Sequence, residues 1–164
     1  MTFSELYERY SADVFRFALF LSGDRAAAED IAAETFARAL VARQPIREGT
    51  VKAYLLAIAR NLYRDGLRRQ ARLIPMTDDH EEHADPSPPP DVVTTDRVAL
   101  ADVLLALQQL PEHERAALVM ATQEGLSHEE IGAALGCSAA AVKVRIHRAR
   151  VRLRLTTGRK DAPS

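Results

Sequence analysis

The stretch GCSAAAVKVRIHRARVRLR, residues 136–154, decides how the C-terminal part of this chain folds. Placed on a helix at about 100° per residue, it has one apolar face, made by Val142, Ile146, Ala149 and Leu153. The opposite face carries Val144, His147, Arg148 and Val151, and it is flanked by Lys143, Arg145, Arg150, Arg152 and Arg154. No acid lies within the stretch, so the repulsion between its cations is not balanced locally. The pattern therefore predicts a packed helix whose outer face binds a polyanion.

The residues before this helix predict a helix-turn-helix. Ser127 and Glu130 form a capping box over the short segment HEEIGAALG, Gly136 suits a left-handed helix end, and Ser138 suits the next N-cap. A short helix, a tight turn and a longer basic helix make the motif that places its second helix in a major groove. We therefore expect this half to bind DNA, with base contacts near the turn and phosphate contacts from the later arginines.

The N-terminal half predicts three helices that close a small core. Thr2 and Glu5 form a capping box for a helix reaching about residue 21, a second helix covers about residues 25–42, and a third follows Thr50 to about residue 71. On the third helix the cations recur every four residues, at Arg60, Arg64, Arg68 and Arg72, with Asn61 inside the same arc and Arg69 nearby. This stripe is a second candidate DNA-binding face, although it could instead pair with the acidic linker that follows.

An acidic, proline-rich segment separates the two halves. Residues 75–96 hold five of the eight prolines among acids and small polar residues, which favours an extended linker that can reach roughly 60 Å. The sequence thus predicts an all-α protein of two small helical domains, residues 1–74 and 96–158, joined by a flexible linker at 75–95. The run His80-Glu81-Glu82-His83 in this linker lacks the i, i+4 histidine spacing of a helical zinc site, so we expect no metal there.

Charge and composition narrow the class of protein further. The net charge of −1 over 164 residues conceals segregation, because residues 138–164 carry eight Lys/Arg and one acid while residues 76–97 carry one and seven. A single cysteine, Cys137, excludes an internal disulfide framework. No stretch reaches the roughly 18 apolar residues of a membrane span, and the acidic N-terminus is unlike a signal peptide. We expect a cytoplasmic protein that uses no cofactor.

Three segments together resemble the extracytoplasmic-function (ECF) sigma factors of bacteria, in the sigma-70 family. They are LYERYSADVFRFALFLSGDRAAAEDIAAETFARAL, VKAYLLAIARNLYRDGLRRQAR and LPEHERAALVMATQEGLSHEEIGAALGCSAAAVKVRIHRARVRLR, in that order, and the resemblance covers nearly all of the chain except the linker and the last few residues. The resemblance implies a region 2-like domain at 1–74 that binds core RNA polymerase and the −10 promoter element. It implies a region 4-like domain at 96–158 that reads the −35 element, and an anti-sigma factor is a plausible further partner.

The resemblance also assigns roles to individual residues. Core polymerase binding falls on Asp30, Glu34 and Phe36, although Glu34 and Arg38 could also be an ordinary i, i+4 surface pair. Recognition of −10 falls on Arg60, Asn61, Arg64, Arg68 and Arg69, and the preceding loop, residues 43–50, would receive a flipped base. Recognition of −35 falls on Lys143, Val144, His147 and Arg148, with Ser138, Arg145 and Arg150 on the same helix as further expected contacts. Ala33 and Leu40 depart from the Gln and Trp usual in the core-binding segment.

Two other classes of function fit the sequence less well. A dimeric regulator of the LuxR type shares the helix-turn-helix but usually lacks the arginine train that follows it here, and it would read a palindrome. An enzyme centred on the linker histidines and His113 would need a buried, convergent polar pocket, which a flexible segment does not supply. We therefore expect a sigma factor and no catalytic residue.

Overall fold

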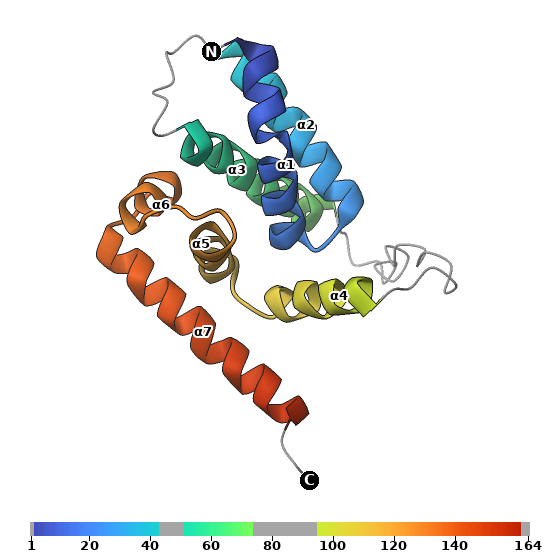
Figure 1. The fold of residues 1–164 in the computed structure, drawn as a ribbon, viewed down its shortest axis with the longest axis vertical. Coiled ribbons are helices and arrows are strands. Elements are labelled where there is room, and N and C mark those ends of the chain that lie inside the picture. The colour runs from blue at the N-terminus through green and yellow to red at the C-terminus, as the bar shows by residue number, and fades with distance from the viewer. Residues whose placement is uncertain (1, 43–50, 74–94, 162–164) are drawn as a thin grey trace.

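The computed structural model describes residues 2–42, 51–73 and 95–161, with side chains placed between 95 and 161 only for 99–155. The base-receiving loop at 43–50, the N-cap at Thr50, and the linker with its His80–His83 run lie outside the described residues. Seven helices and no strand make up the described part, in agreement with the predicted all-α class (Figure 1).

Three helices form the N-terminal half: α1 (Phe3–Ser22), α2 (Arg25–Val41) and α3 (Val51–Leu73). The predicted capping box is present, since Thr2 Oγ1 accepts from the Glu5 amide at 3.2 Å and Glu5 Oε2 accepts from the Thr2 amide at 3.1 Å. Gly23 ends α1 at a φ of 70°, a left-handed conformation that glycine adopts without steric cost. Apolar side chains from all three helices, including Phe17, Phe36 and Leu55, are buried between them.

Four helices form the C-terminal half: α4 (Thr95–Gln108), α5 (Glu112–Thr122), α6 (His128–Leu135) and α7 (Ala139–Asp161). Ser127 and Glu130 cap α6 reciprocally, and Ser138 Oγ accepts from the Ala141 amide at the start of α7. The turn between α6 and α7 is tight, because a Cβ added at Gly132 would lie 2.5 Å from the Cys137 carbonyl oxygen. The predicted helix-turn-helix is therefore present, with a glycine required where α6 meets the turn.

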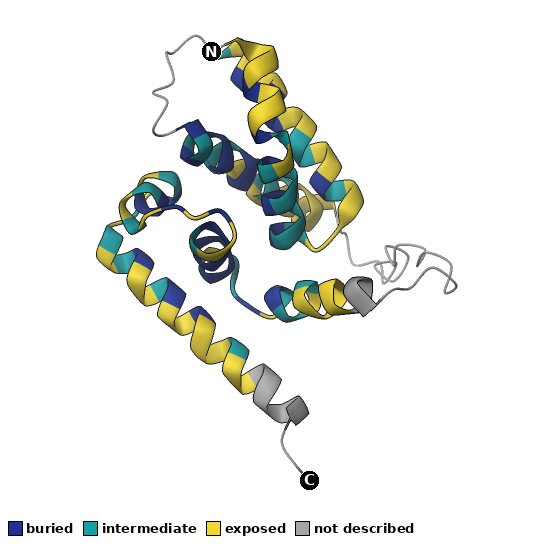
Figure 2. Ribbon diagram, in the orientation of Figure 1, coloured by how far each residue is buried: buried dark blue, intermediate teal, exposed yellow. Residues whose placement is uncertain are grey.

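The two halves lie directly against each other. α5 and α4 pack on α1, α6 packs on α3, and α7 runs along the outer side of the C-terminal half (Figure 1). Leu107, Leu110 and Met120 belong to the same buried cluster as Phe17 and Leu21 of the N-terminal half, and buried residues line the sides of the helices that face each other (Figure 2). A linker of about 20 residues allows wide separation, but the described helices form a closed arrangement.

Candidate nucleic-acid interface

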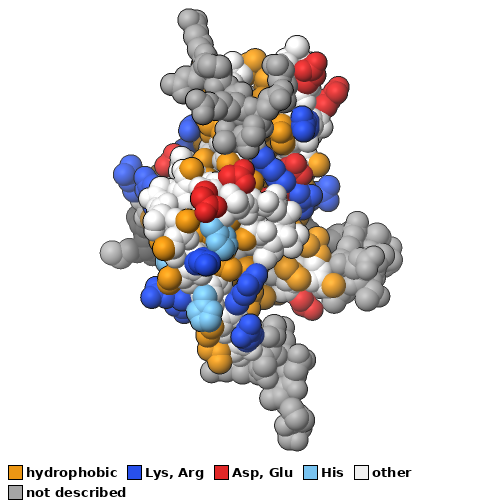
Figure 3. Space-filling model, turned by 60° about the vertical axis from the view of Figure 1, so that its left-hand side comes forward, with side chains coloured by type: hydrophobic (Ala, Val, Ile, Leu, Met, Phe, Trp, Pro, Cys, Tyr) orange, Lys and Arg blue, Asp and Glu red, His pale blue; other side chains and the backbone are white. Residues whose placement is uncertain are grey.

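The outer face of α7 is exposed as its periodicity predicts. Val142, Ile146 and Ala149 are buried against the preceding helices. Most of the expected −35 contacts are exposed, namely Ser138, Lys143, Val144, His147, Arg148 and Arg150, while Arg145 is half-buried. Lys and Arg side chains, with His side chains among them, gather over the C-terminal part of the surface in Figure 3. This face presents cations around a short apolar residue, Val144, near the start of a helix, the arrangement that a major groove accommodates.

Several acids of the same half have partners within its own fold. Glu114 is buried and accepts a hydrogen bond from Arg152 Nε at 2.9 Å, so its charge is turned toward the inner side of α7. Glu129 and Glu130 lie in the first turn of α6, where the helix dipole stabilises a negative charge. Glu114 therefore adds no exposed negative charge beside the α7 outer face.

The arginine stripe on α3 divides into an exposed and a buried part. Asn61, Arg64, Arg68 and Arg69 are exposed, and Arg68 Nη1 lies 3.6 Å from Asp65 Oδ1. Arg60 is different, because only 5% of it is exposed and its guanidinium faces the C-terminal half. Among the described residues, then, four of the five expected −10 contacts lie on the surface and one does not.

Arg60 forms a bidentate ion pair with Glu112, at the start of α5. Arg60 Nε donates to Glu112 Oε2 at 3.0 Å and Nη2 donates to Oε1 at 2.8 Å, while Arg64 Nε lies 3.8 Å from the same oxygen. The stripe therefore pairs with an acid of the packed C-terminal half, a partner that the sequence reasoning did not consider. The physical reason is the closed arrangement, which brings Glu112 at the start of α5 to Arg60 of α3 across 52 positions of sequence.

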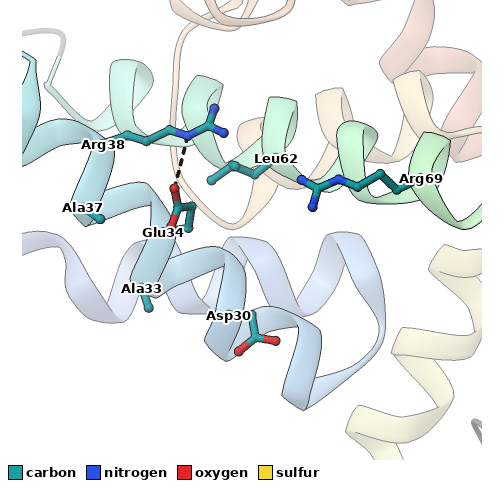
Figure 4. A pocket seen from close by; sticks show the side chains of 7 residues that line it. All are labelled: Asp30, Ala33, Glu34, Ala37, Arg38, Leu62 and Arg69. Carbon is teal, nitrogen blue, oxygen red and sulfur yellow. Dashed lines mark ion pairs between the residues drawn. The ribbon is translucent and has the colours of Figure 1, made fainter.

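The expected polymerase-binding residues on α2 also differ in their exposure to solvent. Asp30 and Glu34 are exposed and line a shallow pocket between α2 and α3, together with Ala33, Ala37, Arg38, Leu62 and Arg69 (Figure 4). Glu34 Oε1 lies 3.5 Å from Arg38 Nε, so the i, i+4 pair considered from the sequence is present. Phe36 is buried and meets the Tyr7 ring edge-on, with centroids 5.1 Å apart. Phe36 thus holds α2 on α1 and exposes only 3% of its surface.

Exposed apolar residues continue the α2 surface beyond Glu34. Leu40 is 60% exposed and Val41 is 77% exposed at the C-terminal end of α2. Leu40 is one of the two positions that depart from the usual pattern, and it keeps an apolar side chain in solvent there. The α2 surface thus combines carboxylates and aliphatic groups, which suits a protein partner better than a nucleic acid.

Three residues that sequence reasoning did not single out organise the contact between the halves. They are Glu112, Glu124 and Arg115. Glu124 is fully buried and accepts from Arg16 Nε at 2.9 Å and Nη2 at 2.8 Å, which raises the pKa of Arg16 despite the opposing effect of burial. The sequence held one signal for this contact. Residues 98–137 contain six acids and one Lys/Arg, whereas the N-terminal half is basic, and opposite charges favour contact between the two halves.

Comparisons with known proteins decide the family. Residues 6–73 match the family described as sigma-70 region 2, and residues 100–153 match sigma-70 region 4. The ECF sigma factor SigM of Bacillus subtilis is 31% identical over 94% of this chain and 94% of its own length. The chain belongs to the ECF family of RNA polymerase sigma factors. Because the N-terminal half also matches a sigma region, a LuxR-type regulator is not supported.

Other sigma factors extend the likeness in sequence and in structure. SigE of Mycolicibacterium smegmatis is 38% identical over 93% of this chain, which spans 60% of that protein's length. In structure, the sigma factor RpoE from Bartonella quintana, solved with the anti-sigma factor NepR, superposes with a TM-score of 0.76 at 27% identity, covering 98% of both chains. No helix in the described ranges is long and apolar enough to cross a membrane.

Proposed function

We propose that this ECF sigma factor binds core RNA polymerase and directs it to promoters, where α7 reads the −35 element and α3 reads the −10 element. One observation carries the proposal: each of the two basic faces lies in a segment that matches a sigma region. The α7 face lies in the segment that matches region 4, and the α3 face lies in the segment that matches region 2. Sigma factors are initiation factors and not enzymes, so the polymerase supplies the chemistry. The protein would accordingly act in the cytoplasm.

Recognition of −35 is assigned to Ser138, Lys143, Val144, Arg145, His147, Arg148 and Arg150. Exposed Val144, His147 and Arg148 lie in the first half of α7, where a recognition helix meets base edges. Arg150 is also exposed and follows further along the helix, where we expect a phosphate contact. Val144 offers an apolar surface to a thymine methyl group. These placements support direct base contact at the start of α7 and phosphate contact further along it.

Recognition of −10 is assigned to Asn61, Arg64, Arg68 and Arg69, with Arg60 joining them when it is released from Glu112. Guanidinium groups bind phosphates and stack on unpaired bases, and the Asn61 amide can donate and accept at a base edge. Core polymerase binding is assigned to the α2 surface formed by Asp30, Glu34, Leu40 and Val41, with Phe36 fixing α2 from beneath. The domains would then be residues 1–74 and 96–158.

An anti-sigma factor is proposed as a further partner. The similar RpoE structure contains the anti-sigma factor NepR, and the superposition extends over both halves of this chain. A protein that stabilised the closed arrangement would keep the two DNA-binding faces from reaching separated elements.

Transcription by purified core polymerase over sheared genomic DNA from the same organism, with and without this protein, tests the proposal. We expect discrete new start sites that depend on the protein and share upstream elements near −35 and −10. Arg148→Glu is expected to weaken −35 binding and to spare core binding, whereas Glu34→Arg is expected to do the reverse. Loss of core binding by folded Arg148→Glu, or no new start sites with the wild-type protein, would contradict the assignment.

A further inference from the structure

Cations border the outer face of α7 on both sides, and the two sides differ in the structure. Lys143 and Arg150 are exposed on one side. On the other side, Arg145 is half-buried, and Arg152 Nε donates to Glu114 Oε1 of α5 at 2.9 Å. Arg152 thus turns part of its guanidinium toward the inside of the C-terminal half, although its position on the helix borders the outer face.

The ion pair joins a buried acid to a cation at the surface. Glu114 lies in the first turn of α5, and its side chain is 3% exposed, whereas the side chain of Arg152 is 54% exposed. A carboxylate loses its hydration on burial, so a charged group that bonds to it stabilises it strongly. His113 Nε2 lies further away, at 3.7 Å from Glu114 Oε2. The burial of Glu114 therefore favours keeping the Arg152 guanidinium at α5.

Arg152 lies at a point of α7 where a cation could also meet DNA. It follows the buried Ala149 by three residues and the exposed Arg148 by four, so Arg148 and Arg152 lie on the same side of the helix. At about 1.5 Å per residue, Arg152 is about 12 Å from Val144 along the helix axis. The later turns of a recognition helix run toward the phosphates that border the groove. We therefore expect an outward-turned guanidinium at this position to reach a phosphate.

We propose that Glu114 limits the DNA-binding face of α7 by holding Arg152 on α5, so that Arg152 makes no phosphate contact with a bound duplex. The proposal rests on the assignment of duplex recognition to α7. A phosphate and a carboxylate both bind a guanidinium by charge-assisted hydrogen bonds. A phosphate that took Arg152 would leave the buried Glu114 carboxylate without its counter-charge, which makes the exchange unfavourable. Arg152 therefore stabilises the packing of α7 on α5 and not the complex with DNA.

This limit lowers the affinity for duplex DNA of any sequence. A cation that neutralises one phosphate steepens the fall of log affinity with log salt by about 0.9, whatever the bases are. Because about 0.15 M salt lies about 0.8 decades below 1 M, one such contact strengthens binding roughly fivefold at that salt. The base contacts assigned to Val144, His147 and Arg148 are separate groups. Glu114 thus reduces sequence-independent binding without changing the groups that read bases.

The test measures the salt dependence of binding to a mixed-sequence duplex of about 20 base pairs, by fluorescence anisotropy between about 0.1 and 0.4 M salt. Glu114→Met removes the acceptor and fills the buried position with an apolar side chain of similar length. Asp102→Asn is the matched control, because it removes the same charge from an exposed position on α4. We expect Glu114→Met to steepen the slope by about 0.9 and to bind roughly fivefold tighter at about 0.15 M salt, and Asp102→Asn to keep the wild-type slope within about 0.3.

A double variant tests the same point at constant net charge. Glu114→Met combined with Arg152→Met replaces the ion pair by apolar side chains, and we expect its slope to equal that of the wild type. A slope shallower by about 0.9 in the double variant would show that Arg152 already contacts a phosphate, and it would overturn the proposal. No steepening in folded Glu114→Met, or equal steepening in Asp102→Asn, would overturn it as well. Circular dichroism checks folding, and the double variant decides the question by itself if Glu114→Met is unfolded.

Arg148→Glu separates this proposal from the proposed function. Unchanged duplex affinity in that variant would contradict the assignment of duplex binding to α7, and the role of Glu114 would fail with it. Weaker duplex binding by Arg148→Glu, together with equal slopes for Glu114→Met and the wild type, would overturn the role of Glu114 alone.

Discussion

Arg115→Met removes a buried guanidinium group that donates hydrogen bonds to four acceptors. The side chain is 6% exposed and donates four hydrogen bonds, to the carbonyl oxygens of Leu21, Leu107 and Leu110 and to the Tyr63 hydroxyl. Methionine keeps the aliphatic packing and removes every donor. The carbonyls of Leu107 and Leu110 belong to the same half as Arg115. The loss of these two hydrogen bonds therefore lowers the stability of the C-terminal half whether or not it packs on the N-terminal half.

The expected fall in the free energy of unfolding follows from the number of hydrogen bonds that the charged guanidinium donates to buried acceptors. Hydrogen bonds to a charged group contribute about 1.5–3 kcal/mol each, and two of the four lie wholly within the C-terminal half. We therefore expect the free energy of unfolding to fall by about 3–5 kcal/mol. For a chain of this size each kcal/mol shifts Tm by about 2–4 °C, so Tm is expected to fall by roughly 6–20 °C.

Thermal and urea unfolding followed by circular dichroism measure this change. The matched control is Arg25→Met, because Arg25 is exposed and, within the described part of the chain, its ion pair is with Glu29 of its own helix, at 3.4 Å. That variant is expected to stay within about 0.5 kcal/mol of the wild type. If Arg115→Met also stayed within 1 kcal/mol, roughly the error of such measurements, the claim that Arg115 anchors α5 would be wrong.

Three further outcomes are expected. Gly132→Ala places a Cβ 2.5 Å from the Cys137 oxygen and should lower stability by about 1–3 kcal/mol in thermal unfolding. Gly66→Ala places its Cβ where no atom of the described residues lies within 4 Å and should raise stability by about 0.4–1 kcal/mol; equal shifts for the two variants would refute the close approach at Gly132. Ser127→Ala removes the α6 capping box and should cost about 1 kcal/mol by urea unfolding, and no change would contradict the cap. Arg150→Gln should reduce the salt dependence of duplex binding by about one phosphate contact, and an unchanged slope would show that Arg150 makes no phosphate contact.

The local features of the fold were predictable from the sequence because their causes are local. The reciprocal pairs Thr2–Glu5 and Ser127–Glu130 lie three residues apart, and the structure places both as capping boxes. The exposed and buried faces of α7 likewise follow from the spacing of Val142 and Ile146 against Arg148. The helix-turn-helix and its basic outer face could therefore be predicted from patterns within about 30 residues of chain.

The burial of Arg60 was not predictable in the same way. Periodicity places it on the same stripe as Arg64 and Arg68, and nothing within the helix distinguishes the three. Its partner Glu112 lies 52 positions away and reaches it only because Arg115 and Glu124 seat α5 on the N-terminal half. The burial of Phe36 has a similar cause, since the Tyr7 ring that covers it belongs to another helix. Contacts between helices distant in sequence leave little trace in local spacing.

Reading of two promoter elements by one chain on one polymerase is the central claim, and the spacing between the elements tests it most directly. The measurement is transcription from a promoter identified with the wild-type protein, compared with the same promoter carrying five extra base pairs between its −35 and −10 elements. Half a helical turn moves one element to the opposite side of the duplex, so we predict loss of initiation although both element sequences are intact. Unchanged initiation from the lengthened promoter would show that α7 and α3 do not read the two elements together, and it would contradict the account.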